Sequence, residues 1–491
     1  MKLDELLNNV DVVDRNNYDN IDVKGVSFDS RKVNDGYVFV CLNGEKNGND
    51  YIAEAISNGA ICIVTEEDVF VDNIPIVIVK DSRIALSIIS KNFYGSCCDK
   101  LEIIMVTGTN GKTTTSYLIN QILNINNYKC AMVGTNGIFY DKKQLYYGLT
   151  TPDPIDLHYY FKVLYELGAR YVVMEASAHA IKLNKLYGIK TKQVVFTNIS
   201  NEHLDYFKTM DEYASTKFEL LYNNNNTLSI VNIDDDYAQK NISNKPPTIT
   251  YGLKNPADSF AVDISCSIDG MKFCANVMDE LFDIETSLVG LYNVYNILAS
   301  ITSARCLGLS KEEIEYGVKS LIEIPGRFNK FFLDLNRLVV VDFAHTPDGF
   351  LQVLSEIKAL RSGRLKVLFG CVGYSDSFKR AEMGRVASMY ADNIVLTTDN
   401  INFENFDLVC EDIVKGITIP YQKVFDRKEA IRMCFDELRE NDTLILLGKG
   451  CETSNLINGV KVPHSDIEEV EKNIERVFNV RKGVSCEGSI I

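Results

Sequence analysis

The chain has 491 residues, of which 46% are hydrophobic and 24% are charged, and its formal net charge is −16. One hydrophobic core does not organise a chain of this length, so we expect roughly two to four domains of an ordinary globular protein. The acidic charge excludes a nucleic-acid-binding surface, which needs a basic field to neutralise phosphates. An anionic substrate must therefore be held by local groups such as helix N-termini, single Arg or Lys side chains and metal ions.

The N-terminal sequence and the cysteines predict a cytoplasmic protein that does not contact a membrane. The first residues, MKLDELLNNVDVVD, are acidic and broken by polar positions, unlike a secretory signal. No stretch approaches the roughly 20 apolar residues that cross a bilayer. The 13 cysteines are an odd number without a C-x-x-C pair, which favours reduced thiols over disulfides or a zinc ribbon. By default we expect a monomer.

Short apolar runs alternate with helical patterns along the chain, which is typical of α/β domains with parallel sheets. A Gly-containing loop after an apolar run near Lys100 and the interruption at Pro325-Gly326 indicate domain boundaries. The run Asn223 to Asn226 predicts a loop. The predicted domains are a small α/β domain over 1–99, a central βαβ domain over 100–325 and a Rossmann-like domain over 326–491.

The strongest local signal is TGTNGKTT between an apolar strand and an amphipathic helix. Glycines let the backbone wrap a polyphosphate, the helix N-terminus offers N–H groups, Lys112 adds a positive charge and Thr113 can bind Mg²⁺. Val106 occupies the first Gly position of the full P-loop pattern, and an incidental Gly-rich turn is the plainer alternative. Without an N-K-x-D signature, the predicted nucleotide is ATP. The residues predicted to bind it are Gly108, Thr109, Asn110, Gly111, Lys112, Thr113 and Thr114.

Further motifs follow in order: TTP, MEASAHA, FTNISNEHLDY, YASTK, GLYNVYN, PGRF, DFAHTPD and GKGCE. From about Val26 to about His464 this combination resembles the Mur ligase family. The resemblance implies a central P-loop ATPase-type parallel sheet between a UDP-binding α/β domain and a Rossmann-like domain that binds the amino acid and completes the ATP site. It also implies an ATP-dependent amide-bond ligase. Such an enzyme would add the third amino acid to UDP-N-acetylmuramoyl-L-alanyl-D-glutamate through an acyl phosphate, in peptidoglycan precursor synthesis.

The resemblance assigns the metal and catalytic residues. Glu175 and His203 each follow a predicted strand, at the sheet edge where ligands of such folds bind, and they match Mg²⁺ ligands beside Thr113. Lys217 would by default be a solvated helical lysine. It matches a family lysine that CO₂ carbamylates into an anionic metal-binding group. The implied catalytic residues are Lys112, Lys217 and His203.

Further matches concern the nucleotide. Asn293 and Asn296 open a helix and match residues that border the adenine, although helix capping also explains them. Arg327, Asp342 and His345 lie beyond the predicted domain break and match contacts to the ATP phosphates and ribose. Closure of the third domain would then assemble the site.

The remaining matches concern the other substrates. For the UDP-sugar they are Ser30, Thr150, Thr151, Ser177 and Lys185. Hydroxyls suit sugar and phosphate oxygens, whereas Lys185 replaces the family's usual Arg and loses its forked donors. For the amino acid the matches are Asp399, Asn400, Asn402, Gly448 and Glu452.

The amino-acid pocket departs most from the family pattern. Relatives that add meso-diaminopimelate carry D-N-P-R, whereas this chain has Asn402 in place of that Arg and Ser375 in place of a second one. Both carboxylate clamps are thus missing, and Cys451 replaces the usual His. This leaves the third amino acid open, including a small or weakly anchored one or an altered acceptor.

Two rival interpretations remain. Folylpolyglutamate synthase shares the P-loop and the ligase logic but lacks a UDP-binding domain before the loop, which here begins only at Thr107. A non-catalytic paralogue that binds nucleotide or UDP-sugar is the other. Retention of Lys112, Glu175, His203 and Lys217 speaks against that paralogue, and the loss of both clamps speaks for it.

Overall fold

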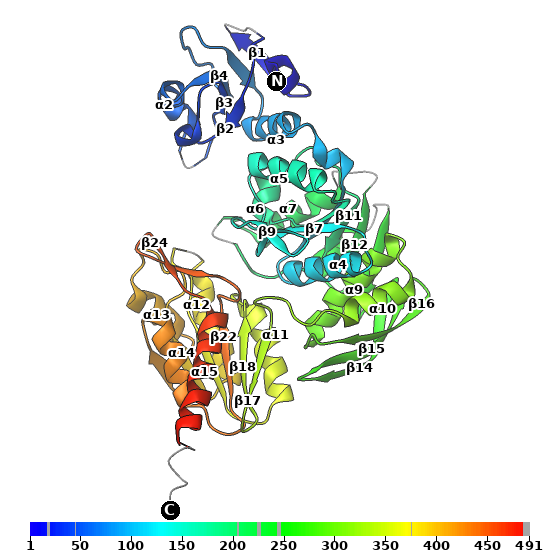
Figure 1. Ribbon diagram of the computed structural model, residues 1–491, viewed down its shortest axis with the longest axis vertical. Helices are drawn as coiled ribbons and strands as arrows, with labels where there is room; N and C mark the ends of the chain where they lie inside the picture. The colour runs from blue at the N-terminus through cyan, green and yellow to red at the C-terminus, as the bar shows by residue number, and fades with distance from the viewer. Residues whose placement is uncertain are drawn as a thin grey trace, which may run out of the picture.

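The computed structural model describes residues 1–16, 20–44, 46–203, 206–222, 227–242, 247–374 and 376–484. The predicted loop Asn223 to Asn226 and the position of Ser375 lie outside these residues. The described chain folds into three α/β bodies, each around its own sheet, which follow one another from the N-terminus to the C-terminus (Figure 1). The prediction of a mixed α/β architecture is therefore confirmed, whereas the exact domain boundaries stay a prediction.

The N-terminal body is a five-stranded sheet in the order β1-β5-β4-β3-β2, parallel except for β1. Its strands are β1 (Val12–Asn16), β2 (Gly25–Ser27), β3 (Tyr37–Val40), β4 (Ala60–Thr65) and β5 (Ile76–Val79). Its helices are α1 (Leu3–Leu6), α2 (Ile52–Ser57) and α3 (Ser82–Phe93), with the 3-10 turns η1 (Ser30–Lys32), η2 (Gly48–Tyr51) and η3 (Cys97–Lys100). The Asp81 carboxylate caps α3 by accepting from the backbone N–H groups of Arg83 and Ile84.

The central body contains an eleven-stranded sheet in the order β16-β15-β14-β13-β12-β11-β6-β10-β7-β8-β9. Strands β7, β10, β6, β11, β12, β13 and β14 run parallel, and antiparallel strands extend both edges. The strands are β6 (Glu102–Thr107), β7 (Cys130–Gly134), β8 (Gly137–Tyr140), β9 (Lys143–Tyr146), β10 (Tyr171–Glu175), β11 (Gln193–Phe196), β12 (Leu228–Asn232), β13 (Thr248–Gly252), β14 (Ser259–Ser267), β15 (Gly270–Val277) and β16 (Glu280–Thr286).

Helices cover both faces of this sheet. The alternation of side chains along β6 shows why: Ile103 and Met105 join one buried cluster, and Ile104 and Val106 join the other. The first cluster includes α5 (Pro154–Glu166) and α7 (Met210–Tyr222), and the second includes α4 (Lys112–Ile125), α9 (Leu291–Cys306) and α10 (Lys311–Lys319). The short helices are α6 (Ala178–Lys182) and α8 (Asp236–Asn241). A sheet buried on both faces places its loops at the strand ends, where the predicted site residues lie.

The C-terminal body is a six-stranded sheet in the order β17-β18-β22-β19-β20-β21, parallel except for β17. Its strands are β17 (Asn329–Leu333), β18 (Arg337–Asp342), β19 (Leu365–Phe369), β20 (Asn393–Leu396), β21 (Tyr421–Lys423) and β22 (Thr443–Leu447). Strands β23 (Ser454–Ile457) and β24 (Val460–Pro463) form a separate hairpin. Its helices are α11 (Pro347–Leu360), α12 (Phe378–Tyr390), α13 (Phe406–Val414), α14 (Arg427–Asp436) and α15 (Asp466–Val484).

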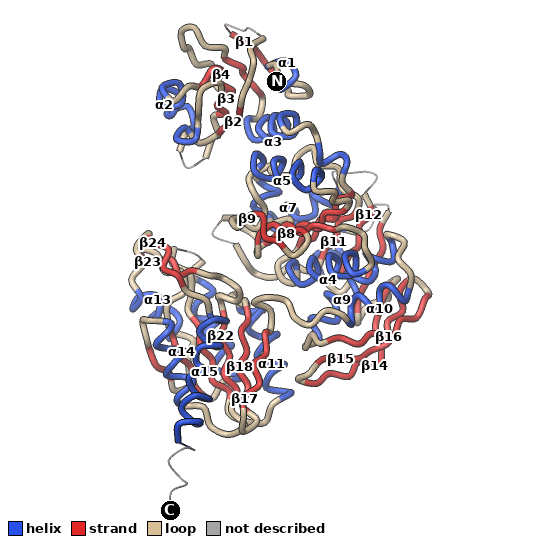
Figure 2. Tube along the Cα trace, viewed as in Figure 1, coloured by secondary structure: helices blue, strands red, loops and turns tan. Residues whose placement is uncertain are grey.

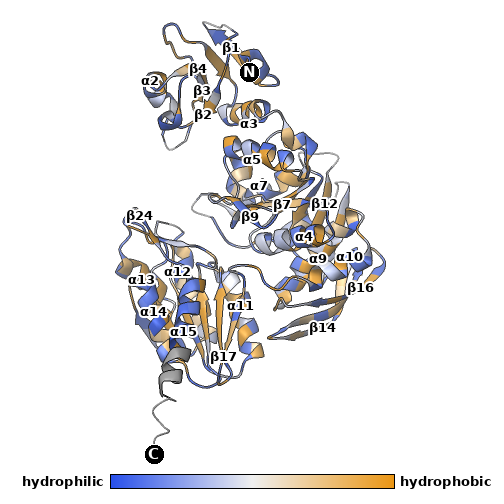
Figure 3. Ribbon diagram, viewed as in Figure 1, coloured by the Kyte–Doolittle hydropathy of each residue, from blue (hydrophilic) through white to orange (hydrophobic). Residues whose placement is uncertain are grey.

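The C-terminal sheet is also sandwiched. Helices α11, α12 and α13 pack on one face, and α14 and α15 pack on the other. Figure 2 shows the helices of this body in blue around its red strands. In Figure 3 the strands between these layers carry the hydrophobic colour. None of the described helices combines the length and the apolar character that a bilayer crossing needs.

We predict that buried His158 makes the stability of the central body sensitive to acid. The side chain is 1% exposed, packs against Phe161, and its Nε2 has no hydrogen-bond partner among the described residues. Burial, with a contribution from Lys91, lowers the pKa of His158 to about 3. Because this value lies below the unfolded one of about 6.5, the unfolded state binds the proton first, and stability is lost as pH falls below about 6.5.

Replacement His158→Phe should remove this loss. Between about pH 7 and pH 4 the variant should retain about 3 kcal/mol more unfolding free energy than the wild type. Urea unfolding at a series of pH values measures the difference. If the unfolding free energies of the two proteins changed in parallel with pH, His158 would not be the group that makes the protein sensitive to acid.

Candidate active site

The loop after β6 has the conformation that its glycines permit. Gly108 and Gly111 have φ of 146° and 84°, and a Cβ at either position would clash, with Thr197 and Asn296 respectively. The backbone of Asn198 accepts from Thr109 N at 2.8 Å, and its side chain accepts from Asn110 N at 2.9 Å. The loop is therefore held open on the N-terminus of α4, as a polyphosphate cradle requires.

The two predicted catalytic lysines meet at one atom. Lys112 Nζ donates to Gly108 O at 2.8 Å and to Thr109 O at 2.7 Å, and Lys217 Nζ donates to Gly108 O at 2.9 Å. Burial lowers the pKa of both lysines, and the charge of Lys112 lowers that of Lys217 further, to well below its ordinary value. Lys217, which is 1% exposed and lies over the Tyr213 ring, is thus biased toward the neutral amine. Only a neutral amine can react with CO₂.

The predicted metal ligands Thr113 and Glu175 are also neighbours. Glu175 is fully buried at the end of β10 and accepts from Thr113 Oγ1 at 3.1 Å and from Thr135 N at 2.9 Å. Arg327, which precedes the C-terminal sheet, donates from Nη2 to Thr113 Oγ1 at 2.8 Å. A hydroxyl and a buried carboxylate are oxygen donors of the kind that Mg²⁺ takes together with substrate phosphates, so these residues fit that ion.

A second buried carboxylate near the loop belongs to Glu202, which our sequence reasoning missed. Glu202 is buried, lies 3.2 Å from His345 Nε2 and 3.6 Å from His203 Nε2, and precedes His203 in the motif FTNISNEHLDY. Burial opposes its ionisation, but the hydrogen bond from His345 and the positive charge of Lys112 hold the pKa of Glu202 well below its usual range. Burial first, then nearby His179 and Lys112, lower the pKa of His203 to about 4 against the opposing charge of Glu202. At neutral pH the imidazole of His203 is therefore uncharged, and its unprotonated ring nitrogen can ligate a metal.

The predicted metal ligands thus lie in two places rather than in one cluster. The described residues hold no group of three or more His, Cys, Asp and Glu side chains arranged around a common point. Lys112 is near enough to Glu202 and to Glu175 for both carboxylates to oppose the lowering of its pKa by burial. A phosphate chain beside Lys112 would therefore have both the Thr113–Glu175 pair and the Glu202–His203 pair nearby.

Asn293 and Asn296 are buried at the start of α9 beside the loop. Asn293 donates to Val289 O at 2.8 Å, and Asn296 donates to Asn293 Oδ1 at 2.9 Å. Asn296 Oδ1 also accepts from Thr115 Oγ1 at 3.4 Å. The asparagines therefore couple α9 to the loop helix α4, and their contact with adenine stays a prediction.

The C-terminal body contacts the central body near the loop at further points besides Arg327. Asp348, at the start of α11, accepts from Asn110 Nδ2 at 2.8 Å, and Cys451 Sγ lies 2.8 Å from Asn136 Oδ1. Asp342 instead accepts from the backbone of Phe328 at 2.8 Å and of Ala344 at 2.7 Å. Asp342 thus shapes the segment that presents His345, whereas Asp348, which the sequence reasoning missed, touches the loop itself.

Three predicted UDP-sugar residues gather near Glu175. Thr151 Oγ1 donates to Glu175 O at 2.9 Å, Ser177 N donates to Thr151 Oγ1 at 3.1 Å, and Thr150 lies 3.2 Å from Thr135 between the hydroxyl oxygens. Outside this group, Lys185 pairs with Asp153 at 2.7 Å. Ser30 belongs to the N-terminal body, where its hydroxyl donates to Glu54 at 2.6 Å.

Four of the five predicted amino-acid residues come together beyond β20 and β22. Asn400 Nδ2 donates to Glu452 Oε2 at 2.8 Å, and a Cβ on Gly448 would clash with Asp399. Asn402 differs, because its backbone N–H donates to Leu456 O and its Oδ1 accepts from Gly459 N, both at 2.9 Å. The side chain that replaces the family Arg thus supports the β23–β24 hairpin.

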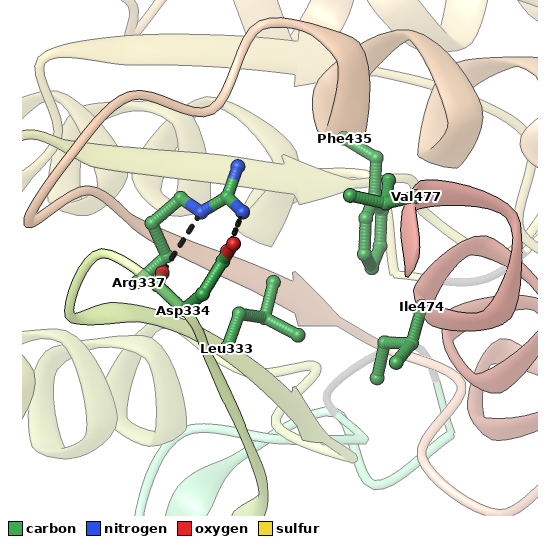
Figure 4. A pocket seen from close by; sticks show the side chains of 6 residues that line it. All are labelled: Leu333, Asp334, Arg337, Phe435, Ile474 and Val477. Atoms are coloured by element: carbon green, nitrogen blue, oxygen red, sulfur yellow. Dashed lines mark hydrogen bonds and ion pairs between the residues drawn. The ribbon is translucent and has the colours of Figure 1, made fainter. Parts of the chain in front are cut away.

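A small pocket lies elsewhere, between the β17–β18 turn and helices α14 and α15 (Figure 4). Four apolar side chains and the ion pair Arg337–Asp334 line it. It contains none of the predicted site residues, and its apolar lining continues the buried cluster under α14 and α15.

Replacement Gly111→Ala should abolish polyphosphate binding, because the added Cβ meets Asn296 at a backbone φ of 84°. Gly168→Ala is the matched control, since Gly168 has φ of 88° but open space around it. Both variants should lose about 1 kcal/mol of stability from backbone strain. Only Gly111→Ala should lose ATP affinity, by at least roughly 100-fold, in calorimetric titration with ATP and Mg²⁺. Equal affinities in the two variants would contradict the assignment.

Three family models match successive parts of the chain. They are described as "Mur ligase family, catalytic domain" over residues 22–94, "Mur ligase middle domain" over 106–304 and "Mur ligase, glutamate ligase domain" over 326–450. The solved structure of "MurF ligase from Thermotoga maritima in complex with ADP" shares the fold at 21% identity and a TM-score of 0.63. The folylpolyglutamate synthase of Mycobacterium tuberculosis also shares it, at 13% identity and a TM-score of 0.59, and covers 75% of this chain.

Whole-length relatives extend these matches. A protein of Caldanaerobacter subterraneus subsp. tengcongensis named UDP-N-acetylmuramoyl-L-alanyl-D-glutamate--2,6-diaminopimelate ligase is 37% identical, covering 92% of this chain and 95% of its own. A protein of the same name from Clostridioides difficile is 35% identical, covering 96% and 98%. A solved structure of a ligase of that name has a TM-score of 0.66 at 32% identity, covering 93% and 95%. This chain therefore belongs to the Mur ligase family of ATP-dependent amide-bond ligases.

Proposed function

We propose that this chain adds the third amino acid to UDP-N-acetylmuramoyl-L-alanyl-D-glutamate, with conversion of ATP to ADP and phosphate, in the cytoplasmic synthesis of peptidoglycan precursors. The observation that carries the proposal is the meeting of Lys112 and Lys217 at Gly108 O, beside the Thr113–Glu175 pair. A non-catalytic binder of nucleotide would not need a second buried lysine there. Relatives named for this acceptor match nearly the whole chain.

The proposed reaction has two steps. The γ-phosphoryl group of ATP passes to the terminal carboxylate of the acceptor and forms an acyl phosphate. The amino group of the third amino acid then attacks the acyl carbon, loses a proton and expels phosphate, which leaves an amide. The protein does little covalent work in either step. Positioning of the reactants and neutralisation of charge therefore supply the rate enhancement.

The described residues divide these tasks. Lys112 and Arg327 bring positive charge to the loop, and the UDP-sugar group around Thr151 and Ser177 holds the acceptor near Glu175. Mg²⁺, when bound, neutralises the transferred phosphoryl group. Thr113 with Glu175 would hold one ion, and His203 with a carbamylated Lys217 would hold a second. Glu202 and His345 bridge the two bodies, so the C-terminal body contacts the central body on the side of the site where His203 lies.

A different third amino acid is the second candidate, and one observation favours it. Asn402 stands where relatives that add meso-diaminopimelate carry an Arg. Its side-chain oxygen Oδ1 already accepts a hydrogen bond from Gly459 N. Nearby Arg427 and Arg380 do not replace that clamp, because each is buried and paired, with Asp466 at 2.7 Å and Glu404 at 2.7 Å. A carboxylate on the far end of the incoming amino acid therefore lacks a forked partner from these arginines.

The reaction can be tested directly. Purified protein with ATP, Mg²⁺ and UDP-N-acetylmuramoyl-L-alanyl-D-glutamate should release phosphate when offered a panel of amino acids that includes diaminopimelate and lysine. Mass spectrometry should show a product heavier by one amino-acid residue, and UDP-N-acetylmuramoyl-L-alanine should give none. Intact ATP binding without product from any amino acid would favour the non-catalytic alternative.

A second test addresses Lys217. Lys217→Ala should lower turnover by roughly 100- to 1000-fold while leaving ATP binding measurable, because an anionic metal-binding group is lost. Small carboxylic acids such as formate or acetate should restore part of the activity by filling the vacated space. Isotope-labelled bicarbonate should give a carbamate signal in the wild type and in the control Lys240→Ala, but not in Lys217→Ala. Unchanged turnover in Lys217→Ala would overturn the assignment.

A further inference from the structure

Lys449 is a fully buried ammonium group that no predicted role uses. It is the second residue after β22 and is 0% exposed. Its Nζ donates to Glu452 Oε2 at 2.8 Å, to Asn400 Oδ1 at 3.1 Å and to Asp399 Oδ1 at 3.3 Å. All three partners belong to the predicted amino-acid site. One buried ammonium group therefore contacts three of the five residues predicted for that site.

The sheet order shows which loops Lys449 connects. Asp399 and Asn400 follow β20, whereas Glu452 follows β22, and β19 lies between these strands. Two strand spacings amount to about 10 Å. The two loops nevertheless meet, because Asn400 Nδ2 donates to Glu452 Oε2 at 2.8 Å, and Lys449 adds a bond to each of these side chains and to Asp399. Gly370, which follows β19, leaves the path open, since a Cβ there would press on Asp399 Cβ at 3.0 Å. Lys449 therefore spans the end of β19 and joins the two loops.

The positive charge of Lys449 also reduces the repulsion between the two carboxylates that it contacts. Asp399 and Glu452 are both carboxylates, and two like charges in a poorly solvated site push their loops apart. The single ammonium of Lys449 leaves one net negative charge in the group. Glu452 is the member that reaches the surface, with 29% of its side chain exposed. Its Oε1 has no partner among the described residues, because Lys449 and Asn400 both bind Oε2.

We propose that Lys449 is the positioning residue of the amino-acid site. It acts through Asp399, Asn400 and Glu452 without touching the amino acid, by tying the β20 and β22 loops together and turning the free oxygen of Glu452 outward. This inference rests on the proposed function, because it needs a third amino acid to bind there.

The test compares Lys449→Met with wild type in the ligation assay. Methionine keeps the length and apolar stem but removes the charge and the donors. The KM for the amino acid should rise roughly 10- to 100-fold, as is typical when a residue that orients a binding group is lost. The kcat at saturating amino acid and the KM for ATP should stay within about twofold of wild type. Lys449→Gln, which keeps N–H donors, should give an intermediate KM and serves as the second variant if Lys449→Met does not fold.

The control is Lys461→Met, an exposed lysine on β24 of the same body, which should leave all constants unchanged. A KM for the amino acid that is unchanged in both Lys449 variants would overturn the inference and leave the proposed function standing. An equal rise in every KM together with a lower unfolding midpoint would overturn it too, because that pattern marks a merely structural lysine. Absence of ligation by the wild type would overturn the proposed function and the inference with it.

Discussion

The carbonyl oxygen of Gly108 accepts hydrogen bonds from two buried lysines, and most of the site depends on this contact. Two positive charges at one acceptor would repel each other, and burial adds to the cost of charge, so the pKa of Lys217 falls well below its ordinary value. The buried carboxylates Glu175 and Glu202 favour the charged form of Lys112. A positive charge there suits the anionic nucleotide that we propose for the loop.

The same contact separates the roles of the two lysines. Lys112 opens α4 and points back over the loop, where we propose that the phosphates bind. Lys217 comes from α7, on the opposite face of the sheet, and the charge of Lys112 is one reason why its pKa falls. A lysine depressed in this way suits covalent modification by CO₂, which would turn a repulsive neighbour into an attractive one.

The C-terminal body contributes to this site by polar contacts. Arg327, His345 and Asp348 each bond to a residue of the central body, namely Thr113, Glu202 and Asn110. Elsewhere the two bodies also share apolar contact, because Val289 of the central body is buried in the cluster beneath α11, α12 and α13. The amino-acid site is held differently, within the C-terminal body alone, because Lys449 ties its loops internally.

The sequence by itself determined much of the nucleotide site. The loop from Gly108 to Thr114, the strand-end position of Glu175 and the alternating α/β pattern all follow from local rules of spacing and polarity, and the structure has them as predicted. Family motifs supplied Lys217 and His203, whose spacing alone would have read as a solvated lysine and a satisfied histidine.

Only the tertiary structure decided which side chains from different elements contact one another. Glu202 stood in a motif already noted, yet its importance depends on His345, which is 143 residues away. Asn402 matched the amino-acid site by position, but its oxygen is bonded to the neighbouring hairpin. Lys449 stands in the motif GKGCE and received no role from the sequence, yet its partners follow two non-adjacent strands. Sequence patterns report local geometry, whereas the order of strands in a sheet decides which distant side chains meet, and that order is a property of the whole fold.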